Sequence, residues 1–131
     1  MSLKKPTSID DRPDFTHPAY VYRCVVTNIV DGDTIDVLID VGFGIHVTKR
    51  LRFLLIDTWE VRGDEREKGL IAKQRLQELV DEAEKVYIQT IMDAEGKYGR
   101  VLAWIWTEKQ DVLFSVNEIL LTEGHGVIYG T

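Results

Sequence analysis

The hydrophobic pattern of this 131-residue chain changes from strand-type to helix-type period after residue 56, and that change does most to limit the folds open to it. Up to residue 56, apolar residues follow one another in three short segments of strand type, the second of which alternates strictly with polar residues. From Ala72 to Ala83, apolar residues recur instead at the spacing of one helical face, which predicts a helix over residues 67–83. Strand-type pattern then returns for two further segments. The chain therefore mixes a small number of strands with one long helix.

The order of the expected elements points to a small barrel. The expected strands cover residues 20–30, 34–41, 45–56, 85–92 and 100–107. A capping box, "SVNE" at 115–118, predicts a short final helix that ends at Gly124. Five strands with a helix after the third are compatible with a five-stranded OB-fold barrel, a β-barrel with helices of the α+β class. A simple α+β sandwich would give the same order of elements.

Composition narrows the classes of function. Hydrophobic residues make up 44% of the chain and charged residues 29%, as in a globular domain. The net charge of −6 excludes a protein that holds polyanions by a general positive field. The single cysteine, Cys24, excludes an internal disulfide and a multi-thiolate zinc site, and its neighbours predict a core position. No apolar run approaches the roughly 20 residues of a membrane span, so no membrane partner is expected.

The N-terminal residues differ from the rest of the chain. Residues 1–19 contain three prolines and no periodicity, which predicts a flexible arm before a domain at 20–131. This segment lacks the apolar core of a secretory signal. A cytoplasmic monomer is therefore expected from the chain as written, or a secreted or periplasmic one if "MSL" has replaced a natural leader.

The stretch "NIVDGDTIDV", residues 28–37, places three carboxylates among β-branched residues that suit a sheet interior. Asp31 precedes a glycine and is interpreted first as a turn former. Asp36, like Asp40 further along, falls on the outward face of its strand and is expected to be solvated. Asp33 starts that strand directly after the bend, where its side chain can point across one end of the barrel.

A second acidic cluster follows the third expected strand in "LLIDTWE", with Asp57 and Glu60 at its end. Strand ends commonly carry functional side chains, although a single Asp there is more often a cap. Carboxylates from two neighbouring strand ends repel each other unless a cation lies between them. Oxygen ligands of this kind suit Ca²⁺ or Mg²⁺ rather than zinc, and the spacing is not that of an EF-hand.

Two arginines can reach the same end of the barrel. Arg52 lies inside the apolar run "LRFLLI", and Arg100 begins the fifth expected strand. For each residue alone, a salt bridge is the simpler interpretation, for example between Arg52 and Asp57 or Glu60. Together, two guanidinium groups beside an acidic, metal-binding end indicate a phosphate, which arginine binds with two parallel hydrogen bonds.

Three blocks of the sequence resemble the signatures of the staphylococcal nuclease (thermonuclease) family. They are "VDGDT" at 30–34, "LRFLLIDTWE" at 51–60 and "KYGR" at 97–100, in the family's order and with a helix between the second and third. The resemblance extends over residues 20–129. It implies a five-stranded OB-fold barrel and a Ca²⁺-dependent phosphodiesterase that acts on DNA and RNA, preferably single-stranded. The family typically cuts the 5′ P–O bond and leaves 3′-phosphorylated products.

The resemblance also implies roles for individual residues. Asp33 and Asp57 would bind calcium together with the backbone carbonyl of Thr58. Glu60 would activate the attacking water.

The remaining implied roles concern the nucleic acid. Arg52 and Arg100 would bind the scissile phosphate and stabilise the charge of the transition state. Three further positions match residues near the bound nucleotide: Lys97, Tyr98 and Tyr129.

The sequence departs from the family pattern at three places. Trp59 stands where the family usually has proline, so the backbone before Glu60 loses a fixed φ. The segment 61–69, "VRGDEREKG", is shorter than in the staphylococcal enzyme, and the chain ends at Thr131 before a third helix. These departures are expected to affect rate, substrate preference and stability.

Two other functions compete with the nuclease. One is a non-catalytic OB-fold module that binds nucleic acid or protein, although such modules commonly lose their catalytic residues. The other is a structural domain whose acids and arginines pair internally, which predicts no binding of calcium.

Overall fold

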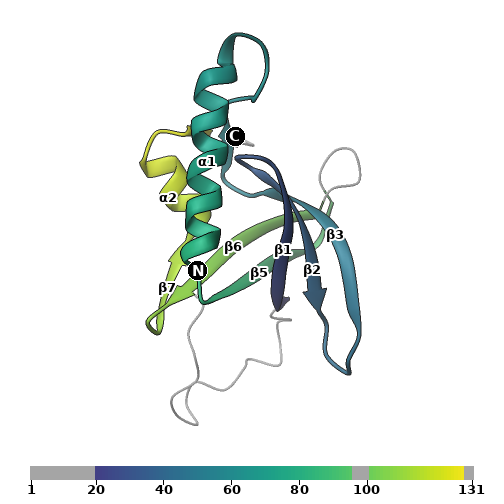
Figure 1. The fold of residues 1–131 in the computed structure, drawn as a ribbon. Coiled ribbons are helices and arrows are strands. Elements are labelled where there is room, and N and C mark those ends of the chain that lie inside the picture. The colour runs from purple at the N-terminus through teal and green to yellow at the C-terminus, as the bar shows by residue number, and fades with distance from the viewer. Residues whose placement is uncertain (1–19, 96–100, 129–131) are drawn as a thin grey trace.

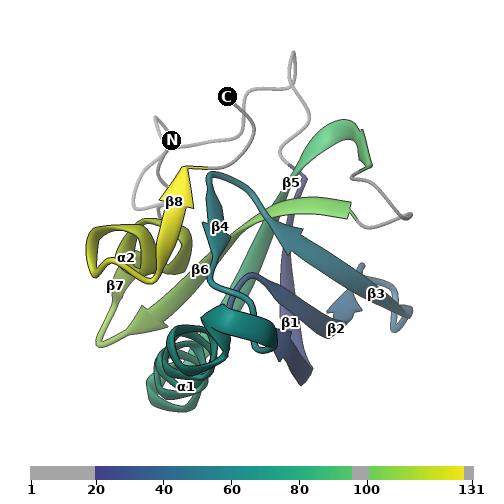
Figure 2. The same cartoon turned by 90° about the horizontal axis from the view of Figure 1, so that it is seen from above.

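The main sheet closes into a barrel. The structure, a computed structural model, describes residues 20–95 and 101–128. The strands are β1 (Val21–Asp31), β2 (Thr34–Asp40), β3 (His46–Phe53), β5 (Lys85–Glu95), β6 (Val101–Lys109) and β7 (Val112–Ser115), in the spatial order β3-β2-β1-β5-β6-β7. Strand β3 also pairs in parallel with β6, from Leu51 opposite Val101 to Phe53 opposite Ala103. This pairing joins the two sides of the sheet, so that β1, β2, β3, β5 and β6 form the predicted five-stranded barrel (Figures 1 and 2).

Both helices pack on the same side of the barrel (Figure 2). Helix α1 (Arg66–Glu82) follows a short 3₁₀ turn, η2 (Gly63–Glu65), and agrees with the prediction to within one residue at each end. Its stripe of Ala72, Leu76 and Leu79 is buried. Helix α2 (Val116–Thr122) is capped as predicted, because the Ser115 hydroxyl accepts a hydrogen bond of 3.3 Å from the Glu118 backbone N–H.

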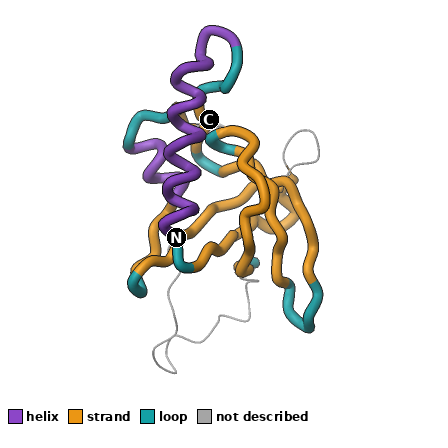
Figure 3. The backbone as a smooth tube through the Cα atoms, viewed as in Figure 1, coloured by secondary structure: helices purple, strands orange, loops and turns teal. Residues whose placement is uncertain are grey.

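The third expected strand is interrupted, which corrects the single strand predicted over residues 45–56. Leu55 adopts a φ of 77°, a left-handed conformation that ends β3 and turns the chain. The Asn117 side chain donates to the Leu54 carbonyl at 2.7 Å and holds this bend. The chain then enters β4 (Ile56–Thr58), which pairs with β8 (Gly126–Ile128) in a separate two-stranded sheet. Strands β7 and β8, of four and three residues, were not predicted. Figure 3 shows the helices lying to one side of the strands.

The barrel interior holds the hydrophobic core. Its fully buried side chains include Ile35, Leu51, Phe53, Ile88, Ile105 and, from the helices, Leu76 and Leu120. Burial of each such side chain contributes about 1.5–3 kcal/mol. Cys24 is buried as predicted, and Asp36 and Asp40 face outward as predicted. Asp36 is held in a salt bridge with Arg50 at 2.7 Å, whereas it was expected to be simply solvated. Val41 was expected inside, but it is 37% exposed because β2 ends one residue earlier.

Two expectations concern the ends of the chain and its surroundings. The predicted flexible arm, residues 1–19, lies outside the described residues. Within the described parts of the chain, no helix is long and apolar enough to cross a membrane.

Candidate active site

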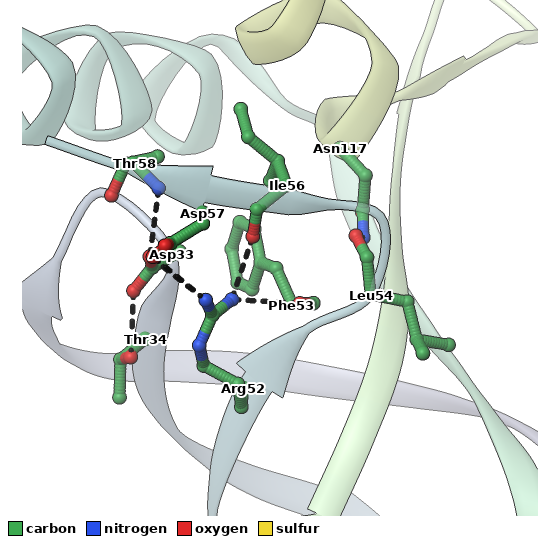
Figure 4. A network of polar contacts seen from close by, with 9 residues as sticks. All are labelled: Asp33, Thr34, Arg52, Phe53, Leu54, Ile56, Asp57, Thr58 and Asn117. Atoms are coloured by element: carbon green, nitrogen blue, oxygen red, sulfur yellow. Dashed lines mark hydrogen bonds and ion pairs between the residues drawn. The ribbon is translucent and has the colours of Figure 1, made fainter. Parts of the chain in front are cut away.

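Asp33 lies in the turn between β1 and β2, and its carboxylate reaches across the barrel end to β4 (Figure 4). Its Oδ2 accepts a hydrogen bond of 2.9 Å from the Thr58 backbone N–H. Its Oδ1 accepts one of 2.9 Å from the Thr34 hydroxyl. The residue is only 7% exposed, so these bonds fix a buried carboxylate in position. The expectation that this side chain points across the end of the barrel is therefore confirmed.

Arg52 supplies the positive charge at this end. Its Nη1 donates to two backbone carbonyls, that of Phe53 at 2.8 Å and that of Ile56 at 2.7 Å. Its Nη2 donates to Oδ1 of Asp57 at 3.1 Å and lies 3.4 Å from Oδ2 of Asp33. The guanidinium is therefore both an anchor for the bend before β4 and the partner of two carboxylates (Figure 4). The salt bridge with Asp57, one of the simpler interpretations from the sequence, is present.

Asp57 and Thr58 belong to β4 and differ in exposure. The Asp57 side chain is 54% exposed, so one of the two carboxylates opens to solvent. Thr58 is 6% exposed, and its hydroxyl oxygen is buried with no hydrogen-bond partner among the described residues. Two carboxylates, one buried and one exposed, thus share the single guanidinium of Arg52.

Glu60 lies two residues after the end of β4 and is exposed to solvent. Its charge also acts on Asp31, at the end of β1. Burial raises the pKa of Asp31, and the neighbouring Asp33 raises it further. Glu60 adds a smaller increase in the pKa of Asp31, while Arg62 and Lys73 lower it. Asp31 is thus part of the same acidic end of the barrel, in addition to its place beside the turn.

A comparison with protein families agrees with this arrangement. The family model described as "Staphylococcal nuclease homologue" matches residues 50–131. This chain belongs to the staphylococcal nuclease family. The matched range includes Arg52, Asp57 and Glu60. Asp33 precedes it and meets Arg52 through the pairing of β2 with β3, in which Thr34 lies opposite Arg52. No curated protein matches the chain significantly.

The oxygen atoms at this barrel end fit a hard cation better than a soft one. The ligands expected from the sequence resemblance are the carboxylates of Asp33 and Asp57, which both contact Arg52, and the backbone carbonyl of Thr58. The described residues contain no group of three or more His, Cys, Asp or Glu side chains placed to hold a metal. Carboxylate and carbonyl oxygens suit Ca²⁺ or Mg²⁺, and so small a protein donor set leaves coordination positions to water or substrate.

The structure brings five of the nine predicted site residues to one end of the barrel: Asp33, Arg52, Asp57, Thr58 and Glu60. The other four lie outside the described residues: Lys97, Tyr98, Arg100 and Tyr129.

Trp59, which replaces the family's usual proline, connects the site to the end of α2 and the start of β8. Its backbone N–H donates to the His125 carbonyl at 3.2 Å, a bond that a proline cannot make. Its indole Nε1–H donates to the Gly124 carbonyl at 3.2 Å. The Lys68 ammonium lies 5.1 Å from the centre of the indole ring, within the range of a cation–π interaction. The tryptophan thus replaces a rigid φ with contacts to two other elements.

Two glycines beside the site had no role in the sequence interpretation. Gly69 lies in α1 and Gly126 in β8, and both are in close contact with the backbone that carries the acidic residues. An isolated glycine inside a helix pattern indicates a close backbone approach, and that signal was present at Gly69. Gly126 lies where no strand was predicted, so the sequence carried no such signal there.

Proposed function

We propose that this chain is a calcium-dependent nuclease that hydrolyses phosphodiester bonds of DNA and RNA, preferably single-stranded. The observation that carries the proposal is the buried guanidinium of Arg52, held between Asp33 and Asp57, with the exposed Glu60 three residues after Asp57. Membership of the staphylococcal nuclease family supports the same chemistry. A metal, a proton acceptor and a phosphate-binding cation are the parts that hydrolysis of a phosphodiester needs.

Asp33, Asp57 and the Thr58 carbonyl are the residues that would hold Ca²⁺. When bound, the ion supplies positive charge that favours the charged form of the phosphate in the transition state. The Arg52 contacts with both carboxylates keep them at the same point before any ligand arrives.

The chain's own residues perform the other tasks. The Glu60 carboxylate takes a proton from the attacking water, whose oxygen forms the new bond to phosphorus. Arg52 and Arg100 bind the phosphate oxygens and stabilise the charge that develops on them. The bond between phosphorus and the 5′ oxygen breaks, the 5′ oxygen takes up a proton from solvent and leaves as a hydroxyl, and the phosphate remains on the 3′ side.

One observation favours the competing function, a non-catalytic OB-fold module. Arg52 donates to two backbone carbonyls and to Asp57, contacts that a purely structural arginine would also make. A binding module would retain the barrel and its affinity for nucleic acid without cutting it.

The decisive experiment is cleavage of a fluorescent single-stranded oligonucleotide in Ca²⁺, in Mg²⁺ and in EDTA. Wild type is compared with Glu60→Gln, which removes the proton acceptor but keeps the size of the side chain. Glu78→Gln is the matched control, because Glu78 lies in α1 and forms a salt bridge of 3.4 Å with Arg75, outside the site. Loss of one such catalytic group is expected to reduce the rate by about 10²–10⁴-fold.

The nuclease proposal predicts cutting by wild type and Glu78→Gln in calcium, none in EDTA, and a strong loss in Glu60→Gln. Oligonucleotide binding without cutting in every metal would support the binding module instead.

A further inference from the structure

Residues 57–60, which carry both a proposed calcium ligand and the proposed proton acceptor, lie between two backbone contacts. We call residues 57–60 the acidic segment. Strand β8 lies against its first half through Gly126, and helix α1 lies against its second half through Gly69. Neither glycine contacts the reacting groups directly. Both touch the main chain from which the acidic side chains extend.

Gly126 allows β8 to approach the metal-ligand half. It pairs with Thr58 in the register of β4 and β8. A Cβ atom at this position would overlap the carbonyl oxygen of Asp57 and lie 2.6 Å from Cα of Thr58. Real Cβ atoms essentially never make such contacts with backbone atoms. Any side chain at position 126 must therefore push β8 and β4 apart.

Gly69 allows α1 to approach the half that carries Glu60. A Cβ atom here would overlap the carbonyl group of Glu60 and lie 2.6 Å from the backbone nitrogen of Val61. Glycine within a helix is unfavourable relative to alanine, so local helix stability alone would favour alanine at this position. The close contact with Glu60 gives a physical reason for glycine. Alanine would displace either the start of α1 or the backbone that presents Glu60.

We propose that Gly126 and Gly69 are positioning residues with separate tasks, which deepens the proposed nuclease function and rests on it. Gly126 sets the position of the calcium ligands Asp57 and Thr58. Gly69 sets the position of the Glu60 carboxylate relative to them. The separation follows from the contacts, because each missing Cβ faces a different half of the acidic segment.

The test measures two properties of Gly69→Ala and Gly126→Ala, namely calcium affinity by calorimetry and kcat on the oligonucleotide in saturating calcium. Gly126→Ala should weaken calcium binding by about tenfold to a hundredfold, as loss of support behind metal ligands does. Its kcat in saturating calcium should change much less. Gly69→Ala should lower kcat by about tenfold or more, because a misplacement of about 1 Å at a reacting group costs up to about 100-fold. Its calcium affinity should stay close to that of wild type.

Gly44→Ala is the matched control for a general loss of stability. Gly44 has a φ of 73°, which alanine adopts with strain, but no atom lies within 4 Å of the added Cβ. It lies in the loop between β2 and β3, at the opposite end of these strands from Asp33 (Figure 1). This variant should melt at a lower temperature than wild type and retain both kcat and calcium affinity. A glycine variant that unfolds under assay conditions is measured at low temperature in trimethylamine N-oxide, which favours compact states.

The results separate the two claims. The division of tasks is overturned if Gly69→Ala and Gly126→Ala change kcat and calcium affinity equally, or if both variants keep wild-type kcat and calcium affinity as Gly44→Ala does. Cleavage by wild type in calcium would still uphold the proposed nuclease function. A wild type that neither binds calcium nor cuts would overturn the proposed function, and the inference with it.

Discussion

Asp33 and Asp57 meet the same nitrogen of Arg52, yet their replacement by asparagine should affect stability very differently. The Asp33 side chain is 9% exposed and the Asp57 side chain 54%. Asp33→Asn removes a buried charge that faces a buried guanidinium, and breaking such a pair costs about 3–5 kcal/mol. Asp57→Asn removes a partner that water can replace, so its expected cost is about 0–1 kcal/mol.

Urea denaturation in EDTA measures these costs without any contribution from bound metal. Wild type, Asp33→Asn, Asp57→Asn and the double variant form a cycle that also gives the coupling between the two carboxylates through Arg52. Equal losses of stability for the two single variants would refute the assignment of Asp33 as the buried partner.

The effects of these two substitutions on calcium affinity should not follow their effects on stability. Each carboxylate is proposed as a ligand, so each substitution should weaken calcium binding regardless of its effect on stability. Titration by calorimetry checks this expectation. Calcium affinity that is unchanged in Asp57→Asn would remove Asp57 from the proposed ligand set.

Three further predictions concern single residues. Asp31→Asn should stabilise the protein at neutral pH in EDTA, because its raised native pKa means that the ionised carboxylate destabilises the fold above that pKa. The gain in stability should vanish when the urea titration is made at a pH well below 3.8, the ordinary pKa of the carboxyl group, because the group is then protonated in both the folded and the unfolded state. A gain that persists at that pH would contradict this reasoning. Trp59→Pro should lower the free energy of unfolding by about 1–3 kcal/mol, because it removes the hydrogen bonds to the carbonyls of His125 and Gly124. An unchanged urea midpoint would show that neither bond contributes to stability. Arg100→Lys keeps the positive charge but loses the two parallel hydrogen bonds to phosphate, so it should lower the cleavage rate far more than the calcium affinity. Equal losses of rate and affinity would indicate a structural role for the residue.

Local pattern was sufficient to predict the elements that are long and regular. The spacing of Ala72, Leu76 and Leu79 located α1 to within a residue, because these three side chains are buried against the rest of the fold. Alternation likewise located β2, whose Ile35 and Val37 face the core and whose Asp36 faces out. These predictions depend only on neighbours along the chain.

The features that long-range contacts determine could not be predicted. The break at Leu55 depends on contacts of its neighbour Leu54 with Ala103 and Asn117, which lie far along the chain. The apolar run itself is typical of one continuous strand. Closure of the barrel also depends on the parallel pairing of β3 with β6, for which local periodicity carries no signal.

For the candidate site, sequence predicted which residues meet but not how they are held. The resemblance placed Asp33, Arg52 and Asp57 together, and the structure shows them in contact. The anchoring of Arg52 by the carbonyls of Phe53 and Ile56 follows from the bend, which was not predicted.

The most direct test of the central claim is the chemistry of the cut ends. Wild type is incubated with a single-stranded oligonucleotide in calcium or in EDTA, and the masses of the products are determined by mass spectrometry. The account predicts fragments with 3′-phosphate and 5′-hydroxyl ends in calcium and intact oligonucleotide in EDTA. Fragments with 5′-phosphate ends, or no cleavage in calcium, would contradict it.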